Sequence, residues 1–390
     1  MFGKIIVLFA CACTLLPAGA APHIPASGAQ VLERLPGGLA PARRELQGLR
    51  AAQSAKPHDL DLATTLAQRY IEQSRRDGDP RYLGYAQAAL APWWNQPQPP
   101  SAVLVLRATL RQSTHQFGAA LLDLDTVLTR DSGNSQAWLT RATVQTITGD
   151  FANARASCMR LYSRAPELVV QACLSSVGSV SGQADASYER LRQSLAARSD
   201  ASPEIRAWVE TLLGEMAARL GRLNAAESHF REAYKLDPAD SYLLGAYADL
   251  LIDRGRAPQA AALLKDKTAA DALLLRYAIA LKATGAPGAA EASRELAARF
   301  DAALRRRDNV HQREQARYEL ALRGDAMAAV RLAKLNWAVQ KEPADLRILA
   351  QVADASRDPE ARRLVQDWLA SSKIEDASLA ALVARLAGKA

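Results

Sequence analysis

The chain has 390 residues, of which 49% are hydrophobic and 23% charged, a composition that excludes wholesale intrinsic disorder. Its formal net charge of +8 favours acidic partners in general. Without a zinc-ligand spacing, an RNA-binding signature or a long basic arm, that charge does not indicate a nucleic-acid partner, and we expect none.

Residues 1–20 have the pattern of a secretory signal peptide. Lys4 precedes an apolar run at residues 5–16, and small residues follow at the expected cleavage site. We expect cleavage after Ala20 and export to the periplasm. In a less favoured alternative, Cys11 ends a loose lipobox and makes the protein a lipoprotein. No later stretch reaches the ~20 apolar residues of a membrane-spanning helix, so we expect no transmembrane segment.

Residues 21–57 form a leader rich in proline and glycine, with room for one short helix near residues 43–53. Further on, the stretch APWWNQPQPP at residues 91–100 places two tryptophans before three prolines. Proline cannot continue a helix, so we interpret this stretch as a helix end followed by a turn.

The strongest repeat signal lies at residues 212–240. There, Gly214 lets two helices cross closely, Gly221 suits a left-handed turn, Phe230 fills the gap to the next helix pair, and Pro238 ends the second helix. This stretch resembles the tetratricopeptide repeat, a helix–turn–helix unit of about 34 residues.

The same pattern recurs in near register from Ser101, Ser135, Ser241 and, after a shortened step, Asp271. The resemblance implies an all-α fold, a right-handed α-solenoid (superhelix) of tetratricopeptide-type helix-turn-helix repeats. The stretches DPRYLGYAQAALAPWW and LAKLNWAVQKEPAD also resemble segments of uncharacterised exported bacterial tetratricopeptide proteins.

Breaks in the repeat pattern predict the domain organisation. We expect an N-terminal array at 58–198, a flexible joint at 199–206, a C-terminal array at 207–374 and a capping helix at 375–390. Trp93 stands where the repeat normally has alanine. It should therefore push the neighbouring helices apart or pack towards the leader.

Only Cys158 and Cys173 remain after the expected cleavage. The repeat frame places them on helices that pack side by side, which makes a disulfide geometrically plausible in an oxidising compartment. Two buried free thiols are an equally weighted alternative.

Catalytic and metal-binding patterns are missing from the sequence. No nucleophile elbow, phosphate-binding loop or dinucleotide fingerprint occurs, and the histidines are too dispersed for a metal site. We therefore expect no enzyme activity, no cofactor and no metal, with the histidines and the closely spaced aspartates on solvated helix faces. These residues are His23, His58, His115, His229, His311, Asp123, Asp125, Asp249 and Asp253.

The resemblance also implies where a partner binds, because the concave wall of a tetratricopeptide superhelix comes mainly from the first helix of each repeat. Trp208 would be an aromatic anchor in that groove, or it would pack under the expected joint. The residues carried over to this groove are Gln112, Thr143, Thr146, Trp208, Glu215, Arg219, Tyr242, Asp249, Asp253, Lys282, His311 and Tyr318.

These patterns favour a non-enzymatic exported scaffold or adaptor that binds a protein or peptide partner in the groove. The alternative is a component of a cell-envelope enzyme complex that acts on an envelope polymer. The basic run at residues 305–307 adds an anionic envelope component as a further candidate partner.

Overall fold

The computed structural model of the chain describes residues 41–306 and 310–388. The chain divides into two compact units, Met1–Glu45 and Leu46–Ala390. The signal peptide and the lipobox expected within residues 1–20 lie outside the described residues, as does the leader up to residue 40.

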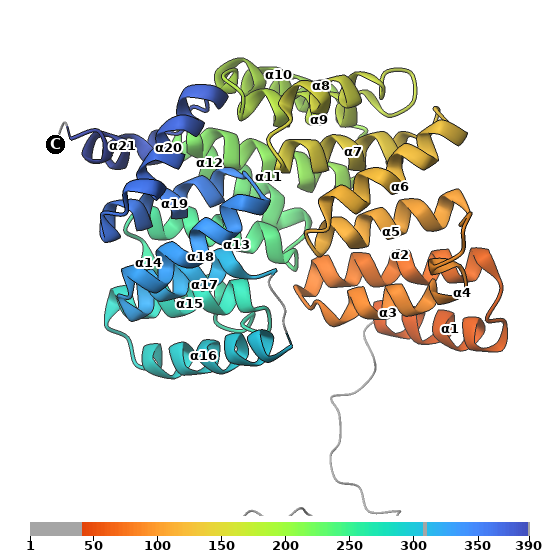
Figure 1. The fold of residues 1–390 in the computed structure, drawn as a ribbon, viewed down its shortest axis with the longest axis horizontal. Helices are drawn as coiled ribbons and strands as arrows, with labels where there is room; N and C mark the ends of the chain where they lie inside the picture. The colour runs from red at the N-terminus through yellow and green to blue at the C-terminus, as the bar shows by residue number, and fades with distance from the viewer. Residues whose placement is uncertain (1–40, 307–309, 389–390) are drawn as a thin grey trace, which may run out of the picture. The chain divides into compact units, whose positions relative to one another are not determined.

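The described secondary structure is entirely helical, since no strand occurs in residues 41–306 or 310–388. Successive helices pack as antiparallel pairs joined by short turns, which confirms the predicted all-α solenoid (Figure 1). The helices are α1 (Pro41–Ala55), α2 (Leu60–Asp77), α3 (Arg81–Ala89), α4 (Ala91–Trp94), α5 (Ser101–Ser113), α6 (Phe117–Arg130), α7 (Ser135–Ile147), α8 (Phe151–Met159), α9 (Glu167–Ser179), α10 (Ala184–Ala197), α11 (Pro203–Arg219), α12 (Leu223–Leu236), α13 (Ser241–Asp253), α14 (Ala257–Leu264), α15 (Asp271–Thr284), α16 (Ala289–Arg305), α17 (Gln312–Tyr318), α18 (Ala326–Val339), α19 (Pro343–Ser356), α20 (Pro359–Ser372) and α21 (Ala380–Leu386).

The strongest repeat of the sequence corresponds to the pair α11–α12. A Cβ atom added to Gly214 would lie 2.6 Å from Cε1 of Phe230, so only glycine allows this close crossing. Phe230 is 1% exposed and fills the space between helix pairs. The turn between the two helices contains Gly221 with φ +73°, a left-handed conformation that glycine adopts without strain.

The expected joint at residues 199–206 is a short turn, because α11 already begins at Pro203. One cluster of buried apolar side chains continues across this turn, from Leu168 on α9 to Ala280 on α15. The turn therefore lies within a continuous core.

The two tryptophans of the proline-rich stretch form their own short helix, α4, which carries Pro92 in its first turn. Trp93 is half-buried and belongs to the same apolar cluster as Leu46 and Leu49 of α1. Of the two expectations for Trp93, packing towards the leader is the one that the structure shows.

At the C-terminal end, a 3-10 turn at Ala377–Leu379 precedes α21. Leu379 and Leu386 are each 2% exposed and join the apolar cluster of the last repeats. These residues cover the end of that cluster, as a capping segment must. Among the described helices, none is long and apolar enough to cross a membrane.

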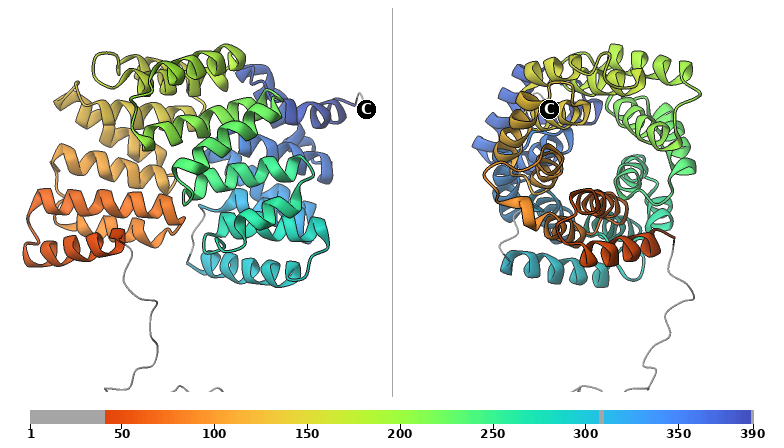
Figure 2. Two further views of the ribbon diagram at one scale, coloured as in Figure 1. Left: turned by 180° about the vertical axis from the view of Figure 1, so that it is seen from behind. Right: turned by 90° about the vertical axis from the view of Figure 1, so that its right-hand side faces the viewer.

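Within Leu46–Ala390 the helices wind around a central axis, so that late repeats lie beside early ones (Figure 2). The backbone N–H of Lys341 donates to the carbonyl oxygen of Ile147 over 2.7 Å. Near the other edge, the Ser241 hydroxyl donates to the carbonyl oxygen of Arg75, also over 2.7 Å. Two turns of the superhelix are thus in direct contact.

Candidate functional site

A cavity of about 480 Å³ lies between the first helices of the C-terminal repeats. We call it the interior cavity. Its walls come mainly from α11, α13, α15, α17 and α19, with Leu223 and Phe230 of α12 and residues 376–378 completing them. Four residues predicted for the groove line it, namely Glu215, Arg219, Asp249 and Asp253.

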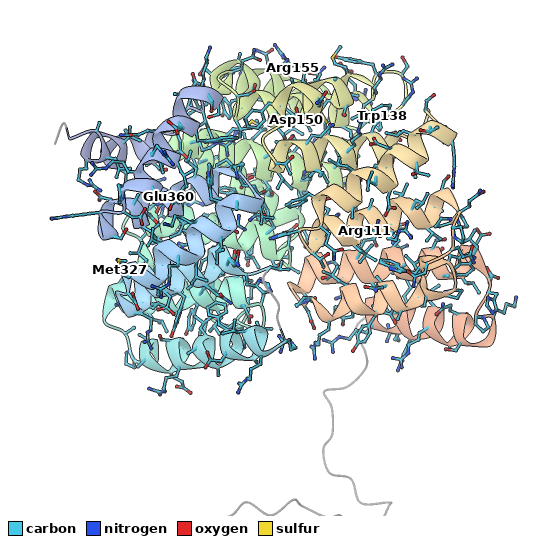
Figure 3. The ribbon with its side chains drawn as sticks, in the orientation of Figure 1. Arg111, Trp138, Asp150, Arg155, Met327 and Glu360 are labelled. Atoms are coloured by element: carbon cyan, nitrogen blue, oxygen red, sulfur yellow. A yellow bond between two sulfur atoms is a disulfide. The ribbon has the colours of Figure 1, made fainter. Side chains whose placement is uncertain are left out.

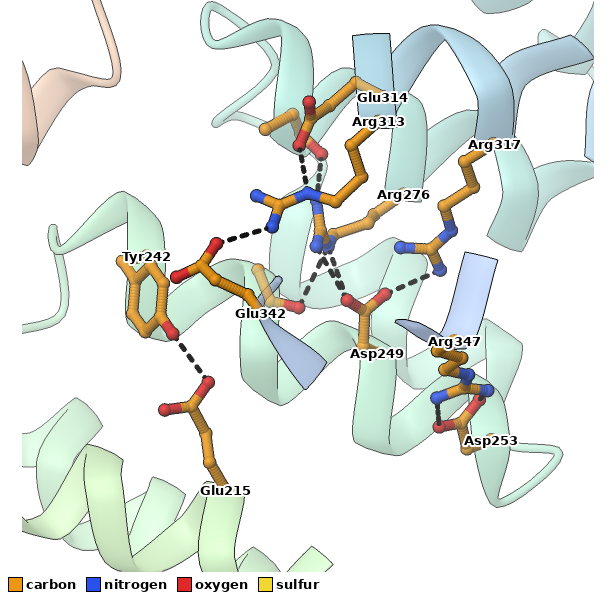
Figure 4. Close-up of polar contacts among 12 residues, drawn as sticks. Glu215, Tyr242, Asp249, Asp253, Arg276, Arg313, Glu314, Arg317, Glu342 and Arg347 are labelled. Carbon is orange, nitrogen blue, oxygen red and sulfur yellow. Dashed lines mark hydrogen bonds and ion pairs between the residues drawn. The ribbon is translucent and has the colours of Figure 1, made fainter. Parts of the chain in front are cut away.

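Asp249 on α13 is held by two arginines from two other helices (Figure 4). Its carboxylate accepts hydrogen bonds from Nη2 of Arg276 and from Nη2 of Arg317, each over 2.7 Å. Burial alone would raise the pKa of Asp249, but the two guanidinium charges outweigh burial and lower it well below its usual range. Asp249 is therefore an ion-pair centre, and the expectation of a solvated helix face is wrong for it.

One turn further along α13, Asp253 pairs with Arg347 of α19. The two N–O distances are 2.5 and 2.6 Å, in a two-point geometry that fixes the guanidinium plane. Both side chains are 33% exposed. This pair joins opposite walls of the interior cavity.

Arg313 on α17 contacts three carboxylates. Its Nη1 lies 2.9 Å from Glu342 and 3.4 Å from Asp345, and its Nε lies 3.2 Å from Glu314. Burial raises the pKa of Glu314, but the charge of Arg313 outweighs it and lowers that pKa to about 2. Arg313 thus fixes α17 against the start of α19.

The Tyr242 hydroxyl donates a 2.7 Å hydrogen bond to Glu215, which links α13 to α11. The negative charge of Glu215 raises the pKa of Tyr242, while burial raises the pKa of Glu215. Tyr242 is 61% exposed, so its ring is accessible to an incoming molecule.

Arg219 differs from the other arginines that line the interior cavity. Its Nη2 donates to the Ser179 hydroxyl over 2.9 Å, yet no carboxylate of the described residues lies within the 4.0 Å of an ion pair. Its Nε is also buried without a hydrogen-bond partner in the described part of the chain. Arg219 is therefore a cation of the cavity wall that has no direct ion pair with a described carboxylate, although its charge acts on nearby Glu215.

Other predicted groove residues have structural contacts. Tyr318 is 4% exposed and packs edge-on against Phe300, with ring centroids 5.5 Å apart, so it belongs to the core and not to the groove wall. Lys282 donates to the carbonyl oxygens of Ala321 and Leu322. His311 is half-buried at the start of α17.

Trp208 is 37% exposed near the start of α11. In the N-terminal half, Gln112, Thr143 and Thr146 are half-buried on α5 and α7. Both threonine hydroxyls bond back to carbonyl oxygens of their own helix. The basic run ends α16, and its residue 307 lies outside the described residues.

Asp123 on α6 corrects a second expectation of a solvated carboxylate. Its side chain is 6% exposed and pairs with Arg107 over 2.6 Å and with Arg111 over 2.7 Å (Arg111 is labelled in Figure 3). Asp125, in contrast, has a 52% exposed side chain, as the sequence predicted.

His229 forms a relay that sequence reasoning missed. Its Nδ1 lies 2.6 Å from Glu210, and its Nε2 lies 3.1 Å from the hydroxyl of Tyr188. Arg222 lies over the Tyr188 ring at 5.1 Å. Burial raises the pKa of Tyr188, which disfavours the phenolate that a nucleophile would require. The relay therefore fastens α10, α11 and α12 together, and His229 is not the solvent-facing residue that we expected.

Cys158 on α8 and Cys173 on α9 are joined by a disulfide in this structure, with Cα atoms 5.6 Å apart. Among the described residues, no group of three or more histidine, cysteine, aspartate or glutamate side chains has an arrangement suited to a metal ion.

Comparison with known proteins finds a tetratricopeptide repeat within the chain. The tetratricopeptide repeat family model matches residues 211–240. A tetratricopeptide repeat protein from Parabacteroides merdae is 15% identical over 75% of this chain and 99% of its own (TM-score 0.38).

The human IFIT1 dimer with PPP-AAAA is 13% identical over 89% of this chain and 87% of its own (TM-score 0.48). Yeast Tom70 is 12% identical over 89% of this chain and 92% of its own (TM-score 0.32). A search of curated protein sequences found no match.

Proposed function

We propose that this chain, an α-solenoid with a tetratricopeptide repeat, is a non-enzymatic exported scaffold that holds a peptide segment of a protein partner in its interior cavity. The observation that carries the proposal is the cavity of about 480 Å³ lined mainly by five first helices. That volume suits a few side chains and excludes a folded domain. The partner therefore presents a short extended segment or a chain end.

The chemistry of the wall indicates what that segment carries. Arg276, Arg313, Arg317 and Arg347 form ion pairs with carboxylates of this chain, whereas Arg219 forms none with the carboxylates of the described residues. A carboxylate of the partner would find its counter-charge at Arg219, and the exposed ring of Tyr242 would add an aromatic contact.

Affinity capture with purified variants tests this proposal. We expect the wild-type chain and Arg190→Gln, a change of an exposed arginine on α10, to retain the same partner from a cell-envelope extract. Arg219→Gln should bind it about tenfold more weakly, because a charge-assisted hydrogen bond is lost. Helix content and melting temperature establish that the variants fold.

Equal retention by all three chains would remove the cavity as the binding site. Turnover of an envelope polymer or of a small substrate by the purified chain would overturn the non-enzymatic assignment.

Export rests on the signal-peptide pattern of residues 1–20. We expect N-terminal sequencing of the mature protein from the periplasm to begin at Ala21. Recovery of the intact chain from the cytoplasm, or of a lipid-modified Cys11, would contradict this part of the proposal.

A further inference from the structure

The segment from Trp368 to Ala377 crosses three successive turns of earlier repeats. Trp368 lies directly over Gly149, where the indole leaves no room for a side chain. Cβ of Lys373 would lie 3.1 Å from a Cβ added to Gly182, and Cβ of Ala377 would lie 3.3 Å from one added to Gly221. We call residues 368–377 the C-terminal latch.

Two specific contacts hold the C-terminal latch in place. The Trp368 ring, which packs against Trp337 within the last repeats, lies 5.8 Å from the ring of Phe151 on the earlier ones. A carboxylate oxygen of Glu375 accepts a 2.8 Å hydrogen bond from the backbone N–H of Ala184. That N–H belongs to the first residue of α10 and has no acceptor within its own helix.

Among the described residues, no cluster of buried apolar side chains spans the seam between the last repeats and the earlier ones here. The apolar cluster of the last repeats runs from Ala316 to Leu386 and includes no residue that precedes Ala316. The described contacts across the seam include hydrogen bonds, ion pairs and the tilted ring contact of Trp368 with Phe151. Segments that share few buried apolar contacts separate at a lower free energy than the core unfolds.

The same segment forms part of the interior cavity, because residues 376–378 line it. Behind them, the pair of Arg347 and Asp253 joins α19 to α13 across the cavity. Movement of the latch away from the turns at Gly182 and Gly221 would therefore remove one wall of the cavity.

We infer that the C-terminal latch separates from the earlier repeats together with the last repeats that carry it, the block with the apolar cluster Ala316–Leu386, while each repeat stays folded, and that this separation widens the interior cavity for a ligand. The role of this opening in ligand binding rests on the proposed function, because the interior cavity is the proposed binding site. The opening itself occurs in the free protein and requires no partner.

Native-state hydrogen exchange tests the opening. The amide protons of Ala184 and Lys341 are protected by acceptors on the other side of the seam, at Glu375 and Ile147. We expect these two amides to exchange through a common opening, at least about tenfold faster than the amide of Leu213 in the core of α11.

Trp368→Ala should speed exchange at Ala184 and Lys341 by about tenfold, because the ring contact with Phe151 is lost. Trp208→Ala removes the same side chain at a place away from the latch and should leave both amides unchanged. Exchange of all three amides at one rate in the wild type, or unchanged rates in Trp368→Ala, would overturn the inference.

Thiol labelling tests the link to the cavity. Ala246, which lines the cavity, is changed to cysteine in a chain that also carries Cys11→Ser and Cys13→Ser. We expect a polymer-linked maleimide to label this position about tenfold faster when Trp368→Ala is added. An unchanged rate would refute the link to the cavity. Neither measurement uses a partner. A negative result in them would therefore refute the opening of the latch without refuting the proposed function, and a negative partner capture would do the reverse.

Discussion

Arg347 and Asp253 form a two-point ion pair, at 2.5 and 2.6 Å, although 94 positions separate them in the sequence. The pair joins two first helices that face each other across the superhelix, since Asp253 ends α13 and Arg347 lies in the first half of α19. Ion pairs therefore connect the helices that line the interior of these repeats. A charged ligand must compete with these existing ion pairs for the same side chains.

The ion pairs of the interior give stability a defined dependence on pH. The folded pKa of Glu314 is about 2, against a usual value of 4.5, so its carboxylate contributes stability above about pH 4.5. That contribution is lost as the pH falls from there through about 2, and Asp249 acts in the same direction. Glu215, whose pKa is raised, has the opposite sign. Denaturant unfolding at about pH 6 and about pH 3 measures the difference.

We expect Glu314→Gln to show a smaller loss of unfolding free energy between these two pH values than the wild type. Asp367→Asn changes an exposed carboxylate on α20 and serves as the control, with the wild-type dependence retained. An unchanged pH dependence in Glu314→Gln would show that this carboxylate is not stabilised by Arg313.

Asp123→Asn should be strongly destabilising. The change leaves two arginines, 12% and 24% exposed, without their counter-charge, and we expect a loss of about 3–5 kcal/mol in the free energy of unfolding. Asp125→Asn removes an exposed pair with Arg141 and should cost less than about 1 kcal/mol. Urea unfolding of both variants measures these two free energies, and equal losses of unfolding free energy would contradict the structure.

Gly214→Ala tests the helix crossing in the strongest repeat. The added methyl group would meet three atoms of the Phe230 ring at less than 3 Å, so we expect a loss of about 1–3 kcal/mol. Gly84 lies on an exposed face of α3 with open space around it, and Gly84→Ala should stabilise by about 0.5–1 kcal/mol. Opposite signs in thermal melts are the expected result, and a loss in both variants would argue against this packing.

Loss of the Cys158–Cys173 bond should lower the free energy of unfolding by roughly 3 kcal/mol, the value for a 15-residue loop in the chain-entropy model. The measurement compares unfolding of the wild type with and without reductant. A variant with both cysteines changed to serine should not respond to reductant. Titration of denatured, unreduced protein that carries Cys11→Ser and Cys13→Ser would find two free thiols if the bond does not form.

Local features of this fold could be predicted from the sequence, because each depends on residues close together in the chain. The close crossing at Gly214, the left-handed turn at Gly221 and the burial of Phe230 all follow from one repeat. Four cavity residues were also predicted, since the first helix of a repeat faces inwards wherever the repeat pattern holds.

The contacts between superhelical turns could not be predicted in this way. They depend on small rotations between neighbouring repeats that accumulate along the superhelix, and the sequence of a single repeat does not determine the total rotation. The pairing of Asp249 with Arg317 and the docking of Trp368 on Gly149 therefore had no sequence signal. Tyr318 was misplaced as well, since its ring packs against Phe300 of α16 and is buried there instead of facing the groove.

Site-specific photo-crosslinking tests the central claim most directly. A photoreactive residue is placed at Gln351, which lines the interior cavity, and in a second chain at Leu122, which is 69% exposed on α6 outside it. We predict that the captured partner crosslinks from Gln351, through one short segment, and not from Leu122. Crosslinks from Leu122 alone would show that the partner binds the outer surface and that the interior cavity is not the binding site.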